Sequence, residues 1–194
     1  MPELNLTFPH SWTAEVLDKR PLILPARQYV YPQQVEEVER GALELLIRPA
    51  PVSDASLAPP FLATCALGFA DPAVPTGIWS CPHPAWLCAL AGGYAYLINT
   101  AQPDQWKQIE YRPVLTVRPL PDHGLILFAG HQSITAWNAA GEAWQSARLS
   151  WEGIKILAVE GTKLTGAGWD LMTDREVDFS LDLLTGEHSG GVRR

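Results

Sequence analysis

The residues of this chain that could do chemistry gather in two segments. The first is the run Cys81–Cys88, CPHPAWLC, which also contains His83. Thiolate and imidazole are ligands that zinc prefers, and structural zinc sites take four of them. Cysteine pairs in such sites are usually two to four residues apart, whereas six residues separate Cys81 from Cys88. The spacing therefore argues against a metal, and we expect Cys88 and the upstream Cys65 to be small core residues.

The second segment is Trp169–Glu176, WDLMTDRE, which has three acids and Arg175 between two expected strands. A glycosidase needs two carboxyl groups about 5–10 Å apart. Acids in loops more often form a solvated turn, so we expect Arg175 to pair with an acid beside it in the sequence. With His83 as a further acid–base group, the candidate catalytic residues are Asp170, Asp174, Glu176 and His83.

The chain has eight tryptophans, and large rings suit both sheet cores and binding surfaces. We expect most of them in the core, among them Trp137 in the second of the sheets described below. The candidate binding residues are Trp79, Trp169 and His131, and the residues nearest to a metal-ligand set are Cys81, His83 and Cys88. No nucleophile elbow, dinucleotide fingerprint or phosphate loop occurs, so we expect no cofactor.

Charge and composition narrow the classes of partner. The formal net charge is −7 and only 18% of residues are charged, with no basic stripe. Nucleic-acid and anionic-membrane binding both need clustered cations, so neither is expected. The first residues, MPELNLTFPHSW, do not read as a secretory signal. Together with the three cysteines, an odd number, this favours free thiols in the cytoplasm of a bacterial-type cell.

The elements that would position these residues follow from a repeated strand–turn–strand unit. It occurs in Gly93–Trp106, Gln132–Trp144 and Val177–His188. Each copy has an alternating apolar strand, an Asn or Asp, a short polar turn and a ring side chain. These positions are Asn99, Asn138 and Asp182 for the amide or acid, and Trp106, Trp144 and His188 for the ring. The amide or acid positions are 39 and 44 residues apart, and a period near 40 is typical of propeller blades.

The repeats predict three successive antiparallel, blade-like sheets within residues 78–191 of a single domain, 1–194. The first sheet covers 78–113, the second 114–151 and the third 153–191. Residues 1–77 are expected to be a Pro-rich N-terminal arm with some strands. Its expected elements are short edge strands at Leu22–Leu24 and Tyr29–Tyr31, a two-turn helix or else an exposed strand at 33–40, and strands at 42–48 and 61–69.

The segment Gly124–Trp144, GLILFAGHQSITAWNAAGEAW, resembles the repeats of β-propellers, in particular pyrroloquinoline-quinone-type and WD-type blades, and Phe179–Glu187 is similar. The resemblance implies a propeller-like fold and does not imply a function. Three blades do not close a ring, since propellers typically have four to eight. The N-terminal strands could supply a fourth sheet, two chains could complete a ring, or the sheets could stack as a sandwich or barrel.

For function, we expect a non-enzymatic interaction or accessory module that binds a protein or self-associates. The alternative is a hydrolase-like enzyme acting on a small or sugar-like substrate through acids of the Asp170–Glu176 loop or a Cys–His pair. A third interpretation is a module stabilised by a metal at Cys81, His83 and Cys88. A pocket that joins Trp79, His83 and Asp174 would favour the enzyme, and an exposed apolar patch would favour the interaction module.

Overall fold

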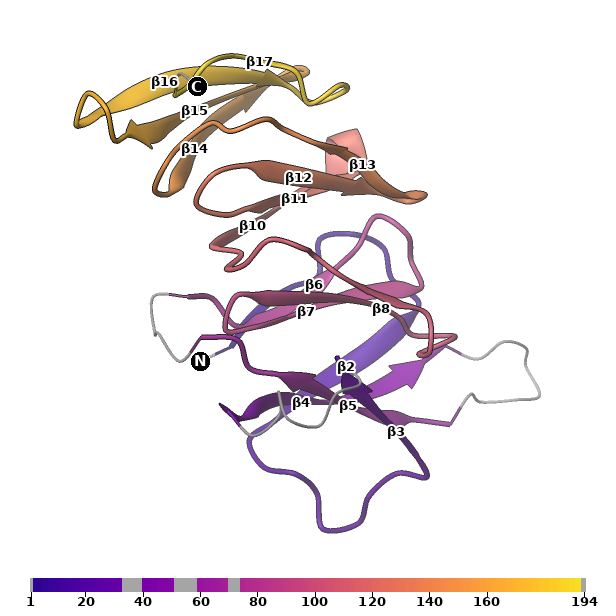
Figure 1. Ribbon diagram of the computed structural model, residues 1–194. Helices are drawn as coiled ribbons and strands as arrows, with labels where there is room; N and C mark the ends of the chain where they lie inside the picture. Colours follow the sequence, from indigo (N-terminus) through magenta and orange to yellow (C-terminus); the bar gives the residue numbers. More distant parts are fainter. Residues whose placement is uncertain (1, 33–39, 51–58, 70–73, 193–194) are drawn as a thin grey trace. The chain divides into compact units, whose positions relative to one another are not determined.

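The computed structural model describes residues 2–32, 40–50, 59–69 and 74–192 (Figure 1). The regular elements in these ranges are β-strands and a short 3-10 helix, η2 (Pro121–His123), so the all-β prediction is confirmed. In the same ranges, no helix is long and apolar enough to cross a lipid bilayer. The chain divides into two compact units, unit 1 (Met1–Pro113) and unit 2 (Val114–Arg194).

Unit 1 consists of two sheets, with strand orders β2-β4-β5-β3 and β1-β6-β7-β8-β9. Most neighbouring strands are antiparallel, but β1 pairs with β6 and β3 with β5 in parallel. The strands are β1 (Glu3–Asn5), β2 (Trp12–Leu17), β3 (Arg27–Tyr31), β4 (Ala42–Pro49), β5 (Phe61–Ala66), β6 (Gly77–Ser80), β7 (Trp86–Ala91), β8 (Tyr94–Asn99) and β9 (Trp106–Gln108).

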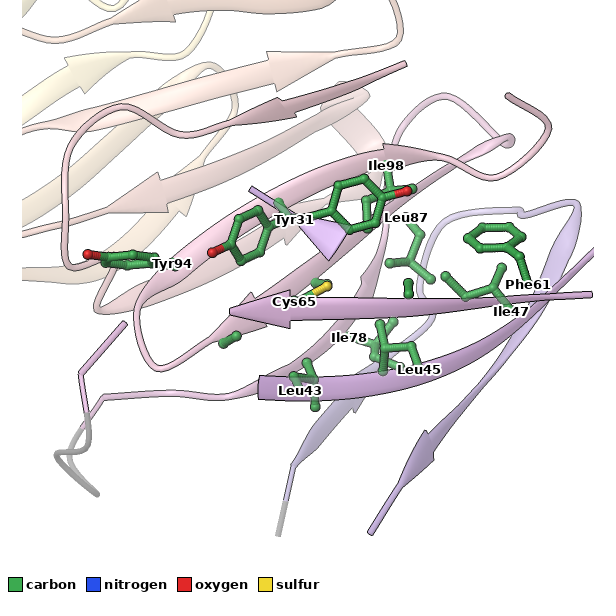
Figure 2. Close-up of a cluster of buried hydrophobic side chains, with 14 of the residues drawn as sticks. Tyr31, Leu43, Leu45, Ile47, Phe61, Cys65, Ile78, Leu87, Tyr94 and Ile98 are labelled. Carbon is green, nitrogen blue, oxygen red and sulfur yellow. The ribbon is translucent and has the colours of Figure 1, made fainter. Parts of the chain in front are cut away.

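The core of unit 1 forms where these two sheets face each other (Figure 2). Strand β4 alternates, so that Leu43, Leu45 and Ile47 are buried while the residues between them are at least partly accessible. Alternation of this kind is the sequence signature of a strand with one apolar face. Opposite them, Tyr96 and Ile98 of β8 complete the same cluster. The predicted strands at 42–48 and 61–69 are therefore present, as β4 and β5.

Unit 2 also consists of two sheets, each a simple antiparallel meander, with orders β10-β11-β12-β13 and β14-β15-β16-β17. Its core lies between them and takes one face of each, for example Leu127 of β11 and Phe179 of β16. The strands are β10 (Thr116–Leu120), β11 (Leu125–Ala129), β12 (Ile134–Asn138), β13 (Gly141–Gln145), β14 (Ile154–Glu160), β15 (Lys163–Asp170), β16 (Arg175–Asp182) and β17 (His188–Gly190).

The three repeats have the same local chemistry. The side-chain Oδ1 of Asn99 accepts hydrogen bonds from the backbone N–H groups two and three residues ahead, at 3.1 and 3.3 Å. Asn138 does the same at 2.8 and 3.2 Å, and Asp182 at 2.7 and 3.1 Å. Each of these residues closes the third strand of its meander and starts the hairpin to the fourth. This Asx turn is the physical reason why the sequence repeats an Asn or Asp there.

The predicted blade-like sheets are thus confirmed, with two differences. The first repeat contains an additional strand, β6, and β1 extends it to five strands. The strands β2 to β5 form a fourth sheet, one of the arrangements that the repeat count left open. The predicted start of the repeats at residue 78 falls within β6, and the boundary between the two units follows Pro113.

Two local predictions are wrong, and a third cannot be compared with the structure. Leu22–Leu24 is an exposed loop rather than an edge strand, because Pro21 and Pro25 deprive its flanks of N–H donors. Trp137 is half-buried and lies outside the unit 2 core, since β12 directs Ile134 and Ala136 into that core and a bulge follows Ala136. The helix or exposed strand predicted at 33–40 falls almost entirely on residues 33–39, which lie outside the described residues.

Candidate functional site

The Cys–His segment is a packed turn. Cys81 and Cys88 are buried, and burial raises the pKa of both thiols well above the usual range. Such thiols stay protonated at neutral pH, whereas nucleophilic and metal-ligating cysteines act as thiolates. His83 is exposed, and its Nδ1 accepts a hydrogen bond of 3.1 Å from the backbone N–H of Ala85. In the described part of the chain, no three His, Cys, Asp or Glu side chains form a group that could hold a metal ion.

The acids of the Trp169–Glu176 segment have separate roles. Asp170 is buried at the end of β15, where its carboxylate accepts bonds from the Met172 N–H at 3.2 Å and the Thr173 hydroxyl at 2.8 Å. Asp174 occupies the left-handed region of the same turn, with φ of 54°. Both acids therefore shape the β15–β16 hairpin. Glu176 is exposed on the outer face of the sheet.

The ion pair of Glu176 differs from the expected one. Its carboxylate pairs with the ammonium of Lys155 on β14, not with the neighbouring Arg175. Alternation along β16 places residues 175 and 176 on opposite faces of the sheet. Lys155 shares the face of Glu176 and lies opposite Ala167, whose small side chain leaves the long lysine stem room to cross β15.

Trp169 and Glu176 are the two predicted site residues that the structure brings together. They are directly opposite each other across β15 and β16. Both line a hollow of about 270 Å³ at the start of β14, which we call the Trp169 hollow. Its other lining residues are Leu115, Glu152, Gly153, Ile154, Lys155, Ala167 and Gly168.

The wall of the Trp169 hollow is held by one buried hydroxyl, that of Ser150. This oxygen accepts hydrogen bonds from the backbone N–H of Trp169 at 2.8 Å and from that of Glu152 at 3.1 Å. It donates to the carbonyl of Gly153 at 2.6 Å. One donor and two acceptor positions are the full capacity of a serine hydroxyl. The arrangement fixes the backbone of three lining residues before any ligand arrives.

The remaining predicted binding residues lie elsewhere. Trp79 is only 1% exposed in β6, so its ring is a packing group of unit 1. His131 is exposed in the β11–β12 turn, and its carbonyl accepts a bond of 2.9 Å from Gly153. His131 thus supports the segment beside the Trp169 hollow through its backbone.

A second exposed feature is the loop of residues 18–26, which joins β2 to β3 in unit 1 (Figure 1). At its tip, Leu22 and Ile23 are 104% and 90% exposed, and Leu24 follows at 41%. Among the described residues, this is the only run of three exposed large apolar side chains. The base of the loop is fixed, because the guanidinium of Arg20 donates to the Gln28 side chain at 3.0 Å. Arg27 lies over the rings of Tyr29 and Phe61, at 5.7 and 5.6 Å from their centres.

No protein-family model matches this chain, and no curated protein does either. Among solved structures, it is similar to a chain of the S. cerevisiae complex of Dbp5 with Nup159, Gle1, IP6 and ADP, with 10% identity and a TM-score of 0.39. It is also similar to the N-terminal domain of Nup159, with 11% identity and a TM-score of 0.35. The alignments cover 98% and 97% of this chain, which spans only about half (52%) of each of those chains.

Sequence reasoning missed the most exposed apolar residues and the partners of Trp169. The signal for the loop was present, because three apolar residues between Pro21 and Pro25 cannot pair as a regular strand. For Ser150 and Lys155 there was no signal. Their proximity to Trp169 and Glu176 depends on the strand register of β14, β15 and β16, which the local sequence does not specify.

Proposed function

We propose that this protein is a non-enzymatic interaction module, and that its β2–β3 loop docks into an apolar groove of a partner protein. The observation that carries the proposal is the exposure of Leu22 and Ile23 at the tip of this loop. Contiguous exposed apolar side chains are uncommon on soluble proteins and typically mark an interaction site. The shape of the surface also favours docking, because the residues project as a tip.

The loop is held ready for binding. Pro21 and Pro25 restrict the backbone on both sides of the apolar tip. The contacts of Arg20 and Arg27 described above fix the two ends of the loop, so less conformational entropy is lost when a partner binds. A tip with fixed ends can present the same side chains to a groove without prior folding.

The charges around the tip indicate the chemistry of the groove. Lys19, Arg20 and Arg27 flank the tip, with Asp18 as the one acid, although the whole chain has a net charge of −7. This local positive charge favours a groove with an apolar floor and an acidic rim. The candidate catalytic groups also favour a non-enzymatic function. The Cys81 thiol has a raised pKa, and the Asp170 carboxylate is hydrogen-bonded within its own turn. Neither is arranged as an activated nucleophile or base.

The proposal is tested by photo-crosslinking in the cells that produce the protein. A photoreactive amino acid replaces Ile23 in the full chain, and in a matched control it replaces Leu184, an exposed apolar residue of unit 2. We expect one major protein adduct at position 23 that is absent at position 184 and is lost when Leu22 is also changed to Asp. Equal adducts at the two positions, or no adduct at position 23, would contradict the proposal. An adduct with lipid instead of protein would replace the proposed partner by a membrane.

A further inference from the structure

The Trp169 hollow lies in unit 2 and has a chemistry of its own, separate from the apolar loop. It combines an aromatic ring with side chains that both donate and accept hydrogen bonds. Small-molecule sites typically show this combination of apolar wall and few polar groups. At about 270 Å³, the hollow is close to the lower end of the usual range of such sites, about 300–1,000 Å³. It therefore has room for one or two sugar-sized rings.

The charges of the hollow select among ligand classes. Glu152, Lys155 and Glu176 are its charged side chains, and Lys155 is already paired with Glu176. Because Lys155 is paired with Glu176, the carboxylate of Glu152 gives the hollow a net negative charge, which disfavours an anionic ligand. A cationic ligand could use the carboxylates but not the Lys155 ammonium. A neutral ligand with many hydroxyl groups can use all three charged side chains. Its hydroxyls donate to the carboxylates and accept from the ammonium.

The ring of Trp169 adds a flat surface for such a ligand. Its backbone N–H is bonded to Ser150, and its carbonyl accepts a bond of 2.9 Å from the Trp151 N–H. The indole is therefore attached to a fixed wall. The face of an indole carries partial negative charge and attracts the weakly positive C–H groups on the face of a sugar ring.

We propose that the Trp169 hollow is a binding site for a short neutral saccharide. The sugar ring stacks on Trp169, and its hydroxyl groups bond to Glu152, Lys155 and Glu176. Ser150 takes no part in these contacts and holds the wall in place. The proposed role of the site is binding alone.

The test uses the full chain labelled with ¹⁵N and three neutral probes: cellotriose, maltotriose and tri-N-acetylchitotriose. The indole N–H signal of Trp169 is assigned with Trp169→Phe and followed during titration. We expect at least one probe to shift this signal in a saturable way at millimolar concentration. The affinity of Trp169→Ala is followed through the backbone amide signals of the other lining residues, in the variant and the parent alike. The substitution should weaken binding of that probe about tenfold or more, because the stacking contact is lost. Trp137→Phe, which changes a half-buried ring outside the hollow, should bind like the parent chain.

A second pair of variants avoids the half-buried tryptophan. Lys155 and Lys163 are both exposed and belong to the same sheet, but only Lys155 lines the hollow. We expect Lys155→Met to weaken binding of the probe about threefold or more, because a charged hydrogen bond is lost. Lys163→Met should leave the affinity for the probe unchanged. Three results would each overturn the proposal: no shift with any of the sugars, equal binding by Trp169→Ala and the parent, or tighter binding of spermidine or inorganic phosphate than of every sugar.

Discussion

The indole Nε1 of Trp144 donates a hydrogen bond of 2.8 Å to the backbone carbonyl of Leu183. Trp144 belongs to β13, and Leu183 follows β16, so this bond joins the two sheets of unit 2. The ring is 9% exposed and belongs to the core cluster. It also lies directly over Gly186, where a Cβ atom would come within 2.7 Å of the indole. One tryptophan thus packs against a turn that only glycine fits.

The Trp144 bond is tested by replacing the indole with a ring that cannot donate. Trp144→Phe keeps most of the buried apolar surface but leaves the carbonyl of Leu183 without this donor. We expect the free energy of unfolding to fall by about 1–3 kcal/mol, the cost of an unsatisfied buried polar group. Urea unfolding of the variant and the parent chain measures the difference.

Trp137→Phe is the matched control for that experiment. The Trp137 indole nitrogen is buried and has no hydrogen-bond partner among the described residues. Its replacement removes an unsatisfied donor, so the stability should stay unchanged or rise slightly. A loss as large as that of Trp144→Phe would show that ring size, not the bond to Leu183, causes the effect.

The close approach at Gly186 gives a second prediction. Gly186 and Gly161 both have positive φ, 74° and 56°, but a Cβ at Gly161 would meet nothing within 4 Å. Gly161→Ala should therefore show only the backbone cost of about 1–2 kcal/mol. Gly186→Ala should cost about 1–3 kcal/mol more, because the added methyl collides with Trp144. Equal losses in thermal or urea unfolding would refute the contact.

The repeated turns explain how much of the fold the sequence could predict. Asn138 and Asp182 carry their own local signal, since an Asx turn needs only that residue and the N–H groups just after it. For this reason the sequence located the repeat units Gln132–Trp144 and Val177–His188, each of which contains the end of one strand and the start of the next. The strand β6 gave no such signal, because Gly77–Ser80 is short and pairs with the distant β1 as well as with β7. Pairing between distant segments is not encoded locally.

The third prediction concerns the contribution of an Asx turn to stability. Asn138→Ala removes the acceptor for two backbone N–H groups, those of Ala140 and Gly141. We expect a loss of about 1 kcal/mol, modest because the turn is exposed and water can replace part of the bonding. Asn138→Asp keeps an acceptor oxygen and should stay close to the parent chain. If both variants lose the same stability in urea unfolding, the acceptor is not what the turn requires.

The buried thiols predict how stability depends on alkaline pH. Burial raises the pKa of Cys65 well above its ordinary value of 9.0, so the folded protein keeps this proton while the unfolded chain loses it. Above about pH 9 the unfolded state therefore binds fewer protons, and stability falls as pH rises. Cys81 and Cys88 act in the same direction.

Cys65→Ala checks this dependence. The variant should lose stability less steeply above pH 9, by about 1.4 kcal/mol per pH unit for the missing thiol. Urea unfolding at pH 8, 9 and 10 gives both slopes, and the comparison is independent of any constant loss that the smaller side chain causes. Parallel curves for variant and parent would mean that Cys65 ionises alike in both states.

Less of the candidate site than of the fold could be predicted from the sequence. From residue type alone, Trp169 was a candidate binding residue and Glu176 a candidate catalytic residue. Only the register of β15 and β16 shows that they lie opposite each other. The role of Asp170 could not be read in the same way, because an acid that closes a hairpin and an acid that binds a ligand look alike in one sequence. By proximity along the chain, Arg175 was expected to pair with Asp174 or Glu176. Alternation instead puts Arg175 and Glu176 on opposite faces, and the strand register brings Lys155 to Glu176.

Leu22 and Ile23 are the residues that we propose dock into a partner protein. The most direct measurement is calorimetric titration of the full chain with the partner recovered through the adduct at position 23. We predict that L22A/I23A binds at least about 30-fold more weakly, because two fully exposed apolar side chains lose their burial in the complex. The control Leu184→Ala should bind like the parent chain. An affinity of L22A/I23A within twofold of the parent would contradict the claim.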